Sequence, residues 1–75
     1  RDRSPGAQPS YGLTPRERDV LALLVEGRTD REIAANLYMA PSTVSWHVKH
    51  ILAKLDVESR TAAATLATRA GLVQT

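Results

Sequence analysis

Two closely spaced helix-start signals constrain the fold of this chain more than any other feature of its sequence. Thr14-Pro15-Arg16-Glu17 and Thr29-Asp30-Arg31-Glu32 each place a threonine three residues before a glutamate. In such a capping box, the threonine hydroxyl accepts a hydrogen bond from the glutamate amide, and the glutamate carboxylate accepts one from the threonine amide. Gly27, between the two boxes, suits the left-handed residue that ends a helix. The chain is therefore expected to form short helices joined by tight turns.

Apolar residues recur at helical spacing in four segments. This spacing predicts helices over roughly 15–26, 30–37, 41–55 and 59–70. Pro15 and Pro41 suit first helical positions, Ser59 suits a helix cap, and Gly71 suits a helix end. So few residues separate the second and third helices that the two must cross steeply, as in a helix-turn-helix unit. The predicted fold class is all-α: a four-helix, bundle-like domain that contains a helix-turn-helix.

Length and composition limit what such a domain contains. Its 75 residues suffice for one small domain, which has to be stabilised by buried aliphatic side chains because the chain has no cysteine. The lack of cysteine also excludes disulfides and thiolate metal sites. No apolar run reaches membrane-spanning length, and no signal-peptide pattern is present. A cytoplasmic protein without membrane contact is expected.

The start of the chain differs in composition from the rest. Residues 1–12 hold prolines, glycines and serines without an apolar period, which predicts a flexible linker or lead-in. Residues 13–75 are expected to form the folded domain. Because the chain starts at Arg1 rather than at a methionine, we expect it to be a fragment of a longer protein with a domain before it.

The third predicted helix has an apolar stripe on one side and a tryptophan on the other. The stripe comprises Val44, Val48, Ile51 and Leu55. The side that carries Trp46 also carries Ser42, Ser45, Lys49 and Ala53. The segment from Ile33 to Leu55 contains no Asp or Glu, although it contains lysines and histidines. An exposed indole on an acid-free, mildly basic face predicts a contact surface for an anionic partner.

Several of these side chains have a structural interpretation as well. Trp46 could pack on a neighbouring helix or on a partner protein. His47 lies at the edge of the apolar stripe, which favours a hydrogen-bonded structural histidine over a ligand. His50 faces outward and could meet either phosphate or water, and Lys54 could lay its stem over apolar surface. Residues 16–19 are most simply a solvated helix face.

No pattern in the chain supports catalysis. The sequence shows no nucleophile beside a base, no glycine-rich phosphate loop, no histidine pair at ligand spacing and no carboxylate dyad. A domain of this size is also too small to enclose a usual ligand pocket. We therefore expect no enzymatic activity, no cofactor and no metal ion.

Many spaced residues of the chain match a known family. They are Leu13 to Leu21, Arg31-Glu32-Ile33-Ala34, Thr43-Val44, His47, Lys54-Leu55, Val57, Arg60 and Gly71-Leu72. Together they resemble the LuxR/NarL (GerE-type) helix-turn-helix domain, from about Leu13 to Val73. This resemblance implies a four-helix DNA-binding domain of a bacterial transcriptional regulator. It also implies that the third helix enters the major groove and that the fourth helix forms a dimer.

The resemblance assigns roles to individual positions. It implies base contacts for Ser45, Trp46 and Lys49. Contacts to the DNA backbone are expected from Arg31, Ser42, Thr43, His50 and Lys54. The dimer interface is expected at Ala63, Leu66, Ala67 and Ala70, with about half of this stripe needed for the core instead. Arg60 matches a family arginine that could pair with Glu17 or touch the DNA backbone, and a structural role is favoured.

Three residues depart from the family pattern. Ala40 stands where the family tends to have a capping Ser or Thr, which predicts a weaker start of the third helix. Asp30 replaces the usual Asn and adds a negative charge near the DNA side. Asp56 replaces a frequent Gly, which predicts a strained or reshaped turn before the last helix.

The sequence thus predicts sequence-specific binding of double-stranded DNA by a transcriptional regulator. Its expected partners are DNA, a second copy of the chain through the last helix, and an N-terminal sensory or regulatory domain of the same protein. DNA binding would place it at the bacterial nucleoid. The alternative is a helical protein-interaction module in which Trp46 anchors a partner and the Ala-rich last helix docks. The acid-free face and the family resemblance both favour DNA.

Overall fold

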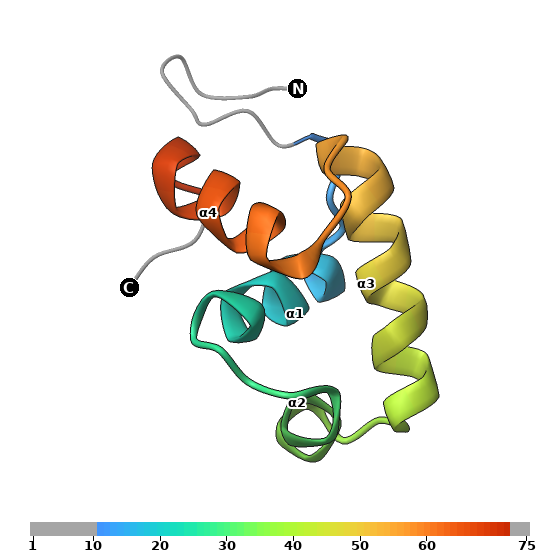
Figure 1. The fold of residues 1–75 in the computed structure, drawn as a ribbon. Helices are drawn as coiled ribbons and strands as arrows, with labels where there is room; N and C mark the ends of the chain where they lie inside the picture. Colours follow the sequence, from blue (N-terminus) through green and yellow to red (C-terminus); the bar gives the residue numbers. More distant parts are fainter. Residues whose placement is uncertain (1–10, 73–75) are drawn as a thin grey trace.

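The computed structural model describes residues 11–72, and within them the fold is all-α. Its helices are α1 (Pro15–Val25), α2 (Asp30–Leu37), α3 (Pro41–Leu55) and α4 (Arg60–Ala70), arranged as Figure 1 shows. The predicted fold class is confirmed, and each predicted helix end agrees to within one residue. Of the expected flexible lead-in, residues 1–10 lie outside the described part of the chain. None of the helices between residues 11 and 72 is long and apolar enough to cross a membrane.

The two predicted capping boxes are both formed. Thr14 Oγ1 accepts from the Glu17 amide at 3.1 Å, and Glu17 Oε1 accepts from the Thr14 amide at 2.9 Å. Thr29 and Glu32 make the same reciprocal pair with the same two distances. These bonds satisfy amides that a helix start otherwise leaves without a partner. The predicted starts of α1 and α2 are therefore confirmed.

The start of α3 has no such support. Its N-cap is Ala40, which makes no side-chain hydrogen bond to the first turn, as its departure from the family pattern predicts. By contrast, the Ser59 hydroxyl at the start of α4 accepts from the Ala62 amide at 3.0 Å. α3 therefore presents first-turn amides that no capping side chain covers.

Left-handed residues end the helices. Gly27 and Gly71 have φ of +84° and +68°, and the Leu72 amide returns to the Ala67 carbonyl at 2.9 Å. α2 and α3 instead end at Tyr38 and Asp56, with φ of +57° and +58°. Non-glycine residues adopt this conformation only at some cost. The strain expected at Asp56 is thus present in its backbone, and Tyr38 carries it as well.

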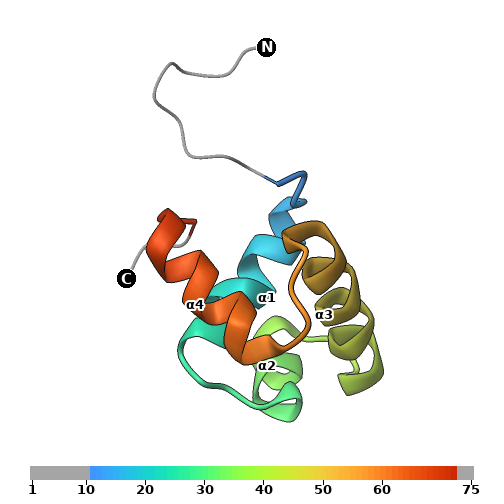
Figure 2. The same ribbon diagram turned by 45° about the horizontal axis from the view of Figure 1, so that its top comes forward.

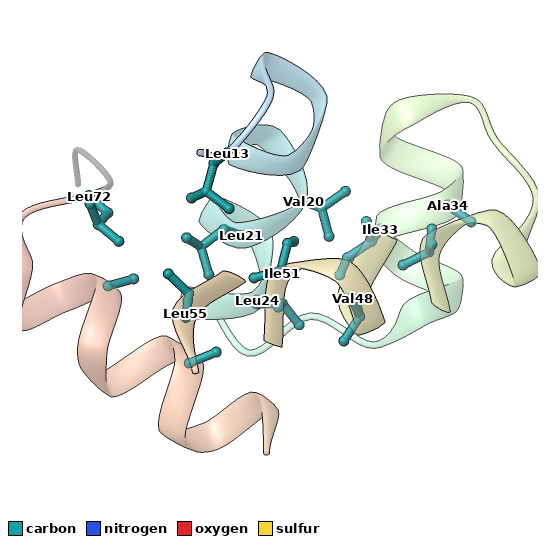
Figure 3. Close-up of a cluster of buried hydrophobic side chains, with 13 residues drawn as sticks. Leu13, Val20, Leu21, Leu24, Ile33, Ala34, Val48, Ile51, Leu55 and Leu72 are labelled. Atoms are coloured by element: carbon teal, nitrogen blue, oxygen red, sulfur yellow. The ribbon is translucent and has the colours of Figure 1, made fainter. Parts of the chain in front are cut away.

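All four helices contribute to one hydrophobic core. Figure 3 shows its side chains converging between the helices. The buried apolar residues are Leu13, Val20, Leu21, Leu24, Ile33, Ala34, Val44, Val48, Ile51, Leu55, Ala63, Ala67 and Leu72. The stripe predicted for α3 is entirely among them, so the register of that helix is the one expected from its period. Its opposite side must therefore face outward.

The arrangement leaves α3 on one side of the molecule. α1 packs against both α3 and α4, whereas α2 packs mainly against α3. α2 and α3 cross steeply, since Figure 1 views α2 nearly along its axis while α3 runs across the picture. In Figures 1 and 2, no other helix lies on the outer side of α3. This is the geometry expected of a helix-turn-helix unit.

Candidate nucleic-acid interface

The outer face of α3 is open to solvent, as the sequence predicts. Trp46 is 56% exposed, so its ring is not covered by the rest of the domain. Ser42, Lys49 and Ala53 are exposed on the same side. Tryptophan is rarely left this exposed without a contact to make. The alternative in which Trp46 packs on a neighbouring helix of its own domain is therefore excluded.

Two histidines hold the indole of Trp46. The His50 ring lies 4.1 Å from it, centroid to centroid, at an interplanar angle of 50°, and the His47 ring lies 5.2 Å away, edge to face. His50 Nδ1 lies 2.9 Å from the Trp46 carbonyl oxygen, which can only accept, so Nδ1 carries the proton. His50 Nε2 remains the nitrogen that faces other partners. These contacts restrict the orientations that the exposed indole can adopt.

Ser45 is linked to both α2 and α4 through Asp30. Its Oγ donates to Asp30 Oδ2 at 2.8 Å, and Arg60 Nη1 donates to Asp30 Oδ1 at 2.7 Å. Burial acts to raise the pKa of Asp30, but the hydrogen bonds from Arg60 and Ser45 and the charge of Arg60 outweigh it, so the pKa lies below its ordinary value. The acidic group at this edge of the interface is thus held as a paired carboxylate.

Two exposed cations, one on α2 and one on α3, form no ion pair with another described residue. They are Arg31 and Lys49. Ser42 and Thr43 are exposed on the first turn of α3, beside the amides that Ala40 leaves uncapped. Unpaired positive charge near the start of a helix favours an anion on this side. The predicted base-contact and backbone-contact residues are all exposed, with one exception.

That exception is Lys54, predicted to contact the DNA backbone. Its Nζ donates to Glu17 Oε1 at 2.7 Å and to the Gly12 carbonyl at 2.9 Å. The prediction for Lys54 is therefore corrected: its ammonium is engaged inside the domain. The physical reason is its position on α3. Lys54 lies on the side of the helix that faces the start of α1, where Glu17 is its partner.

Glu17 corrects a second expectation. It was assigned to a solvated helix face, yet it is only 4% exposed. Burial acts to raise its pKa, but hydrogen bonds from Lys54 and the Thr14 amide, with the charges of Lys54 and His47, outweigh it. The pKa of Glu17 consequently lies below its ordinary value. A buried carboxylate of this kind has to keep its partners.

Two further residues differ in detail from expectation. His47 is half-buried, as a structural histidine should be, but its Nδ1 is buried without a hydrogen-bond partner among residues 11–72. Arg60 has the structural role that was favoured, with Asp30 rather than Glu17 as its partner. The expected partner Glu17 is instead paired with Lys54.

The predicted dimer stripe on α4 is only partly available. Ala63 and Ala67 are 0% exposed inside the core, so their assignment to a dimer interface is corrected. Small side chains at these positions let α4 approach the other helices closely. Leu66 and Ala70 are half-buried and pack against the core. On the outer side of α4 lies an open hollow of about 300 Å³, lined by Ala64, Thr65, Thr68 and Arg69.

Sequence reasoning missed the contacts that join Asp30 to Ser45 and Arg60. No local spacing indicates them, because the partners lie 15 and 30 residues away. It also assigned no role to Tyr38, which is 95% exposed in the turn between α2 and α3. A positive φ at a tyrosine has no signal in the sequence.

Comparison with known proteins agrees with this geometry. The family described as "Bacterial regulatory proteins, luxR family" matches residues 11–67. The transcriptional regulatory protein LiaR of Bacillus subtilis is 46% identical over 67 residues, covering 89% of this chain and 32% of LiaR. The DNA-binding transcriptional activator DevR/DosR of Mycobacterium tuberculosis is 48% identical over 60 residues, covering 80% of this chain and 28% of the relative.

A solved structure shares the fold. The transcription factor GerE superposes with a TM-score of 0.77 at 32% sequence identity, covering 88% of this chain and 97% of that chain. The two curated relatives are much longer, and the chain spans about a third of their length. The similarity therefore concerns one domain of those regulators.

Proposed function

Because this chain belongs to the luxR family of bacterial regulatory proteins, we propose that it binds double-stranded DNA and reads its sequence for a transcriptional regulator. The observation that carries the proposal is the outer face of α3, where Trp46 and Lys49 are exposed on an acid-free surface. Family membership confirms the predicted resemblance, and it assigns the chain to regulatory proteins rather than to enzymes.

The proposed mode of binding places α3 in the major groove, which is wide enough to admit one helix. Lys49 would donate to guanine O6 or N7, and Trp46 would cover a thymine methyl group or a sugar. The tilted ring contact between His50 and Trp46 supports this role, because an indole that is already restricted in the free protein loses less conformational entropy on binding. Ser45, exposed on the same helix, is hydrogen-bonded to Asp30 of α2.

Contacts to phosphate would set the register of the helix on the duplex. Arg31, Ser42 and Thr43 are exposed and suit this role. His50 is exposed as well, and it would donate to phosphate with a proton on Nε2 in addition to the one on Nδ1. Their charges and donors carry no sequence information, but neutralised phosphates release counterions and so supply affinity. The start of α3, which no side chain caps, adds the positive end of a helix dipole on the same side. Lys54 is left out of this set because Glu17 and Gly12 engage it.

We further infer that two copies pair through the outer side of α4 in the full-length protein. The surface available comprises the exposed parts of Leu66 and Ala70 and the hollow at Ala64, Thr65, Thr68 and Arg69. Two-fold pairing would place the recognition helices about one DNA turn apart, on a pseudo-palindromic site. A sensory or regulatory domain of the same protein would control this pairing, in the bacterial cytoplasm at the nucleoid.

Fluorescence anisotropy with labelled duplex DNA tests the proposal. The 75-residue chain should bind weakly, with log affinity falling against log salt at a slope of roughly −0.9 per phosphate contacted. Lys49→Ala should weaken binding, whereas Glu58→Gln, a change at an exposed residue of the α3–α4 turn, should not. Absence of binding even at low salt would reject the proposal. An affinity that hardly changes with salt would favour the apolar protein-docking alternative.

A further inference from the structure

The hydroxyl of Ser45 has a fixed donor direction. Its Oγ lies 2.8 Å from Oδ2 of Asp30. A serine hydroxyl has one proton and two acceptor lone pairs, whereas an ionised carboxylate only accepts. Since Asp30 cannot donate, the proton of Ser45 lies between the two oxygens. What Ser45 still offers to a partner on the outer face of α3 is a lone pair.

Asp30 is held in this state from its other side. Arg60 Nη1 donates to Oδ1 at 2.7 Å, so a donor from α4 and a donor from α3 each engage one carboxylate oxygen. The side chain of Asp30 is 29% exposed, which limits competition by water for these oxygens. The lowered pKa of Asp30 agrees with an ionised group at neutral pH. Both hydrogen bonds are therefore donated to Asp30, one by Arg60 and one by Ser45, and Asp30 acts only as an acceptor.

We propose that Asp30 sets the hydrogen-bonding polarity of Ser45, so that α3 presents an acceptor to the DNA base edge at this position. The inference rests on the proposed DNA-binding function. In the major groove, adenine N6 and cytosine N4 donate, whereas guanine O6 and N7 and thymine O4 accept. Ser45 then selects a base that carries an exocyclic amine. A keto edge is disfavoured because two acceptors would face each other without a proton between them.

The Asp30→Asn substitution keeps the shape of the side chain and reverses this polarity. The amide oxygen of the new asparagine pairs best with the cationic Arg60. The amide NH2 group of the asparagine then points toward Ser45. Ser45 then accepts from that group, and its own proton is released toward the groove. The preference for an amine-bearing base should be lost or inverted. Asp30 is thus a positioning residue that acts through Ser45.

The test begins with duplexes selected from a random pool by the unaltered 75-residue chain. The base pair read by Ser45 is the one at which Ser45→Ala changes the base preference. There the unaltered chain should favour adenine or cytosine on the contacted strand by roughly two- to tenfold, as expected for one hydrogen bond. Asp30→Asn should remove or reverse that ratio. The double variant Asp30→Asn/Ser45→Ala should have the same base preference at this position as Ser45→Ala alone.

Two controls separate polarity from fold and charge. Thermal unfolding of each variant shows whether the fold is retained. Asp30→Asn also removes a negative charge, which should raise affinity for all duplexes by one factor and leave the ratios at other base pairs unchanged.

The outcomes discriminate. An unchanged ratio in the Asp30→Asn chain overturns the inference, as does a change that persists in the Ser45→Ala background or a Ser45→Ala variant without effect at any base pair. In each case DNA binding itself stands. A chain that binds no duplex at all rejects the proposed function instead.

Discussion

Lys54 Nζ lies 2.7 Å from Oε1 of Glu17 and joins the last turn of α3 to the first turn of α1. The same ammonium reaches the Gly12 carbonyl at 2.9 Å, so it also holds the segment that leads into α1. Glu17 in turn closes the capping box of α1 through Thr14. One ion pair therefore connects a helix start, a helix end and the entry to the domain.

The first prediction concerns the two lysines of α3. Lys54→Met should reduce the free energy of unfolding by about 2 kcal/mol, because it leaves the buried Glu17 carboxylate without its cation. Lys49→Met is the matched control, since Lys49 is exposed and forms no ion pair within residues 11–72. Urea denaturation measures both. Equal losses in the two variants would show that the Lys54–Glu17 pair does not stabilise the domain.

The second prediction concerns acid. The folded-state pKa values of Glu17 and Asp30 lie below the ordinary 4.5 and 3.8, so at low pH the unfolded chain binds more protons than the folded one. Their stabilising contribution is complete above about pH 5 and is lost as the pH falls through the lower folded-state values. Denaturation midpoints across this range should fall steeply. Glu17→Gln should flatten the dependence, and the exposed Glu58→Gln should not.

The third prediction concerns the start of α3. Ala40→Ser should raise the free energy of unfolding by about 1 kcal/mol, because the new hydroxyl can accept from a first-turn amide that has no side-chain cap. Ser59→Ala at the start of α4 should cost about the same amount, since it removes an existing cap. Chemical denaturation compares the two. No gain from Ala40→Ser would mean that water already satisfies those amides equally well.

The fourth prediction concerns the left-handed helix ends. Tyr38→Gly should stabilise the domain by about 0.5–1 kcal/mol, because relief of the backbone strain exceeds the added entropy of the unfolded chain. No packing is lost, since Tyr38 is 95% exposed. Asp56→Gly should give a smaller gain because aspartate tolerates this conformation better. A loss of stability in Tyr38→Gly, seen by urea denaturation, would contradict the assignment of strain.

The fifth prediction separates the two kinds of DNA contact. Lys49→Ala should relax the base preference at one position, which is worth about 1–3 kcal/mol for a well-made contact. Arg31→Ala should weaken binding to all duplexes about equally and reduce the salt slope by about 1. Competition titrations against single-base variants of a selected site measure both. Identical specificity profiles for the two variants would refute this division of roles.

Local physical chemistry made most of the fold predictable from the sequence. The capping boxes at Thr14 and Thr29 depend on hydrogen bonds between residues three apart, and both are formed as expected. The period of α3 likewise assigns Val44 to the core and Trp46 to the surface, because a helix turns by a fixed angle per residue. These interactions lie within one or two helical turns, so the order of residues alone determines them.

The tertiary structure alone decided which charged groups meet. Lys54 and Glu17 are 37 residues apart, Arg60 and Asp30 are 30 apart, and no spacing rule relates them. Such pairs form where packed helices bring two side chains together, and this also decides that Ala63 and Ala67 belong to the core rather than to a dimer. The sequence by itself determined the helices and the buried side of α3. The packing of those helices determined which polar groups remain free to bind.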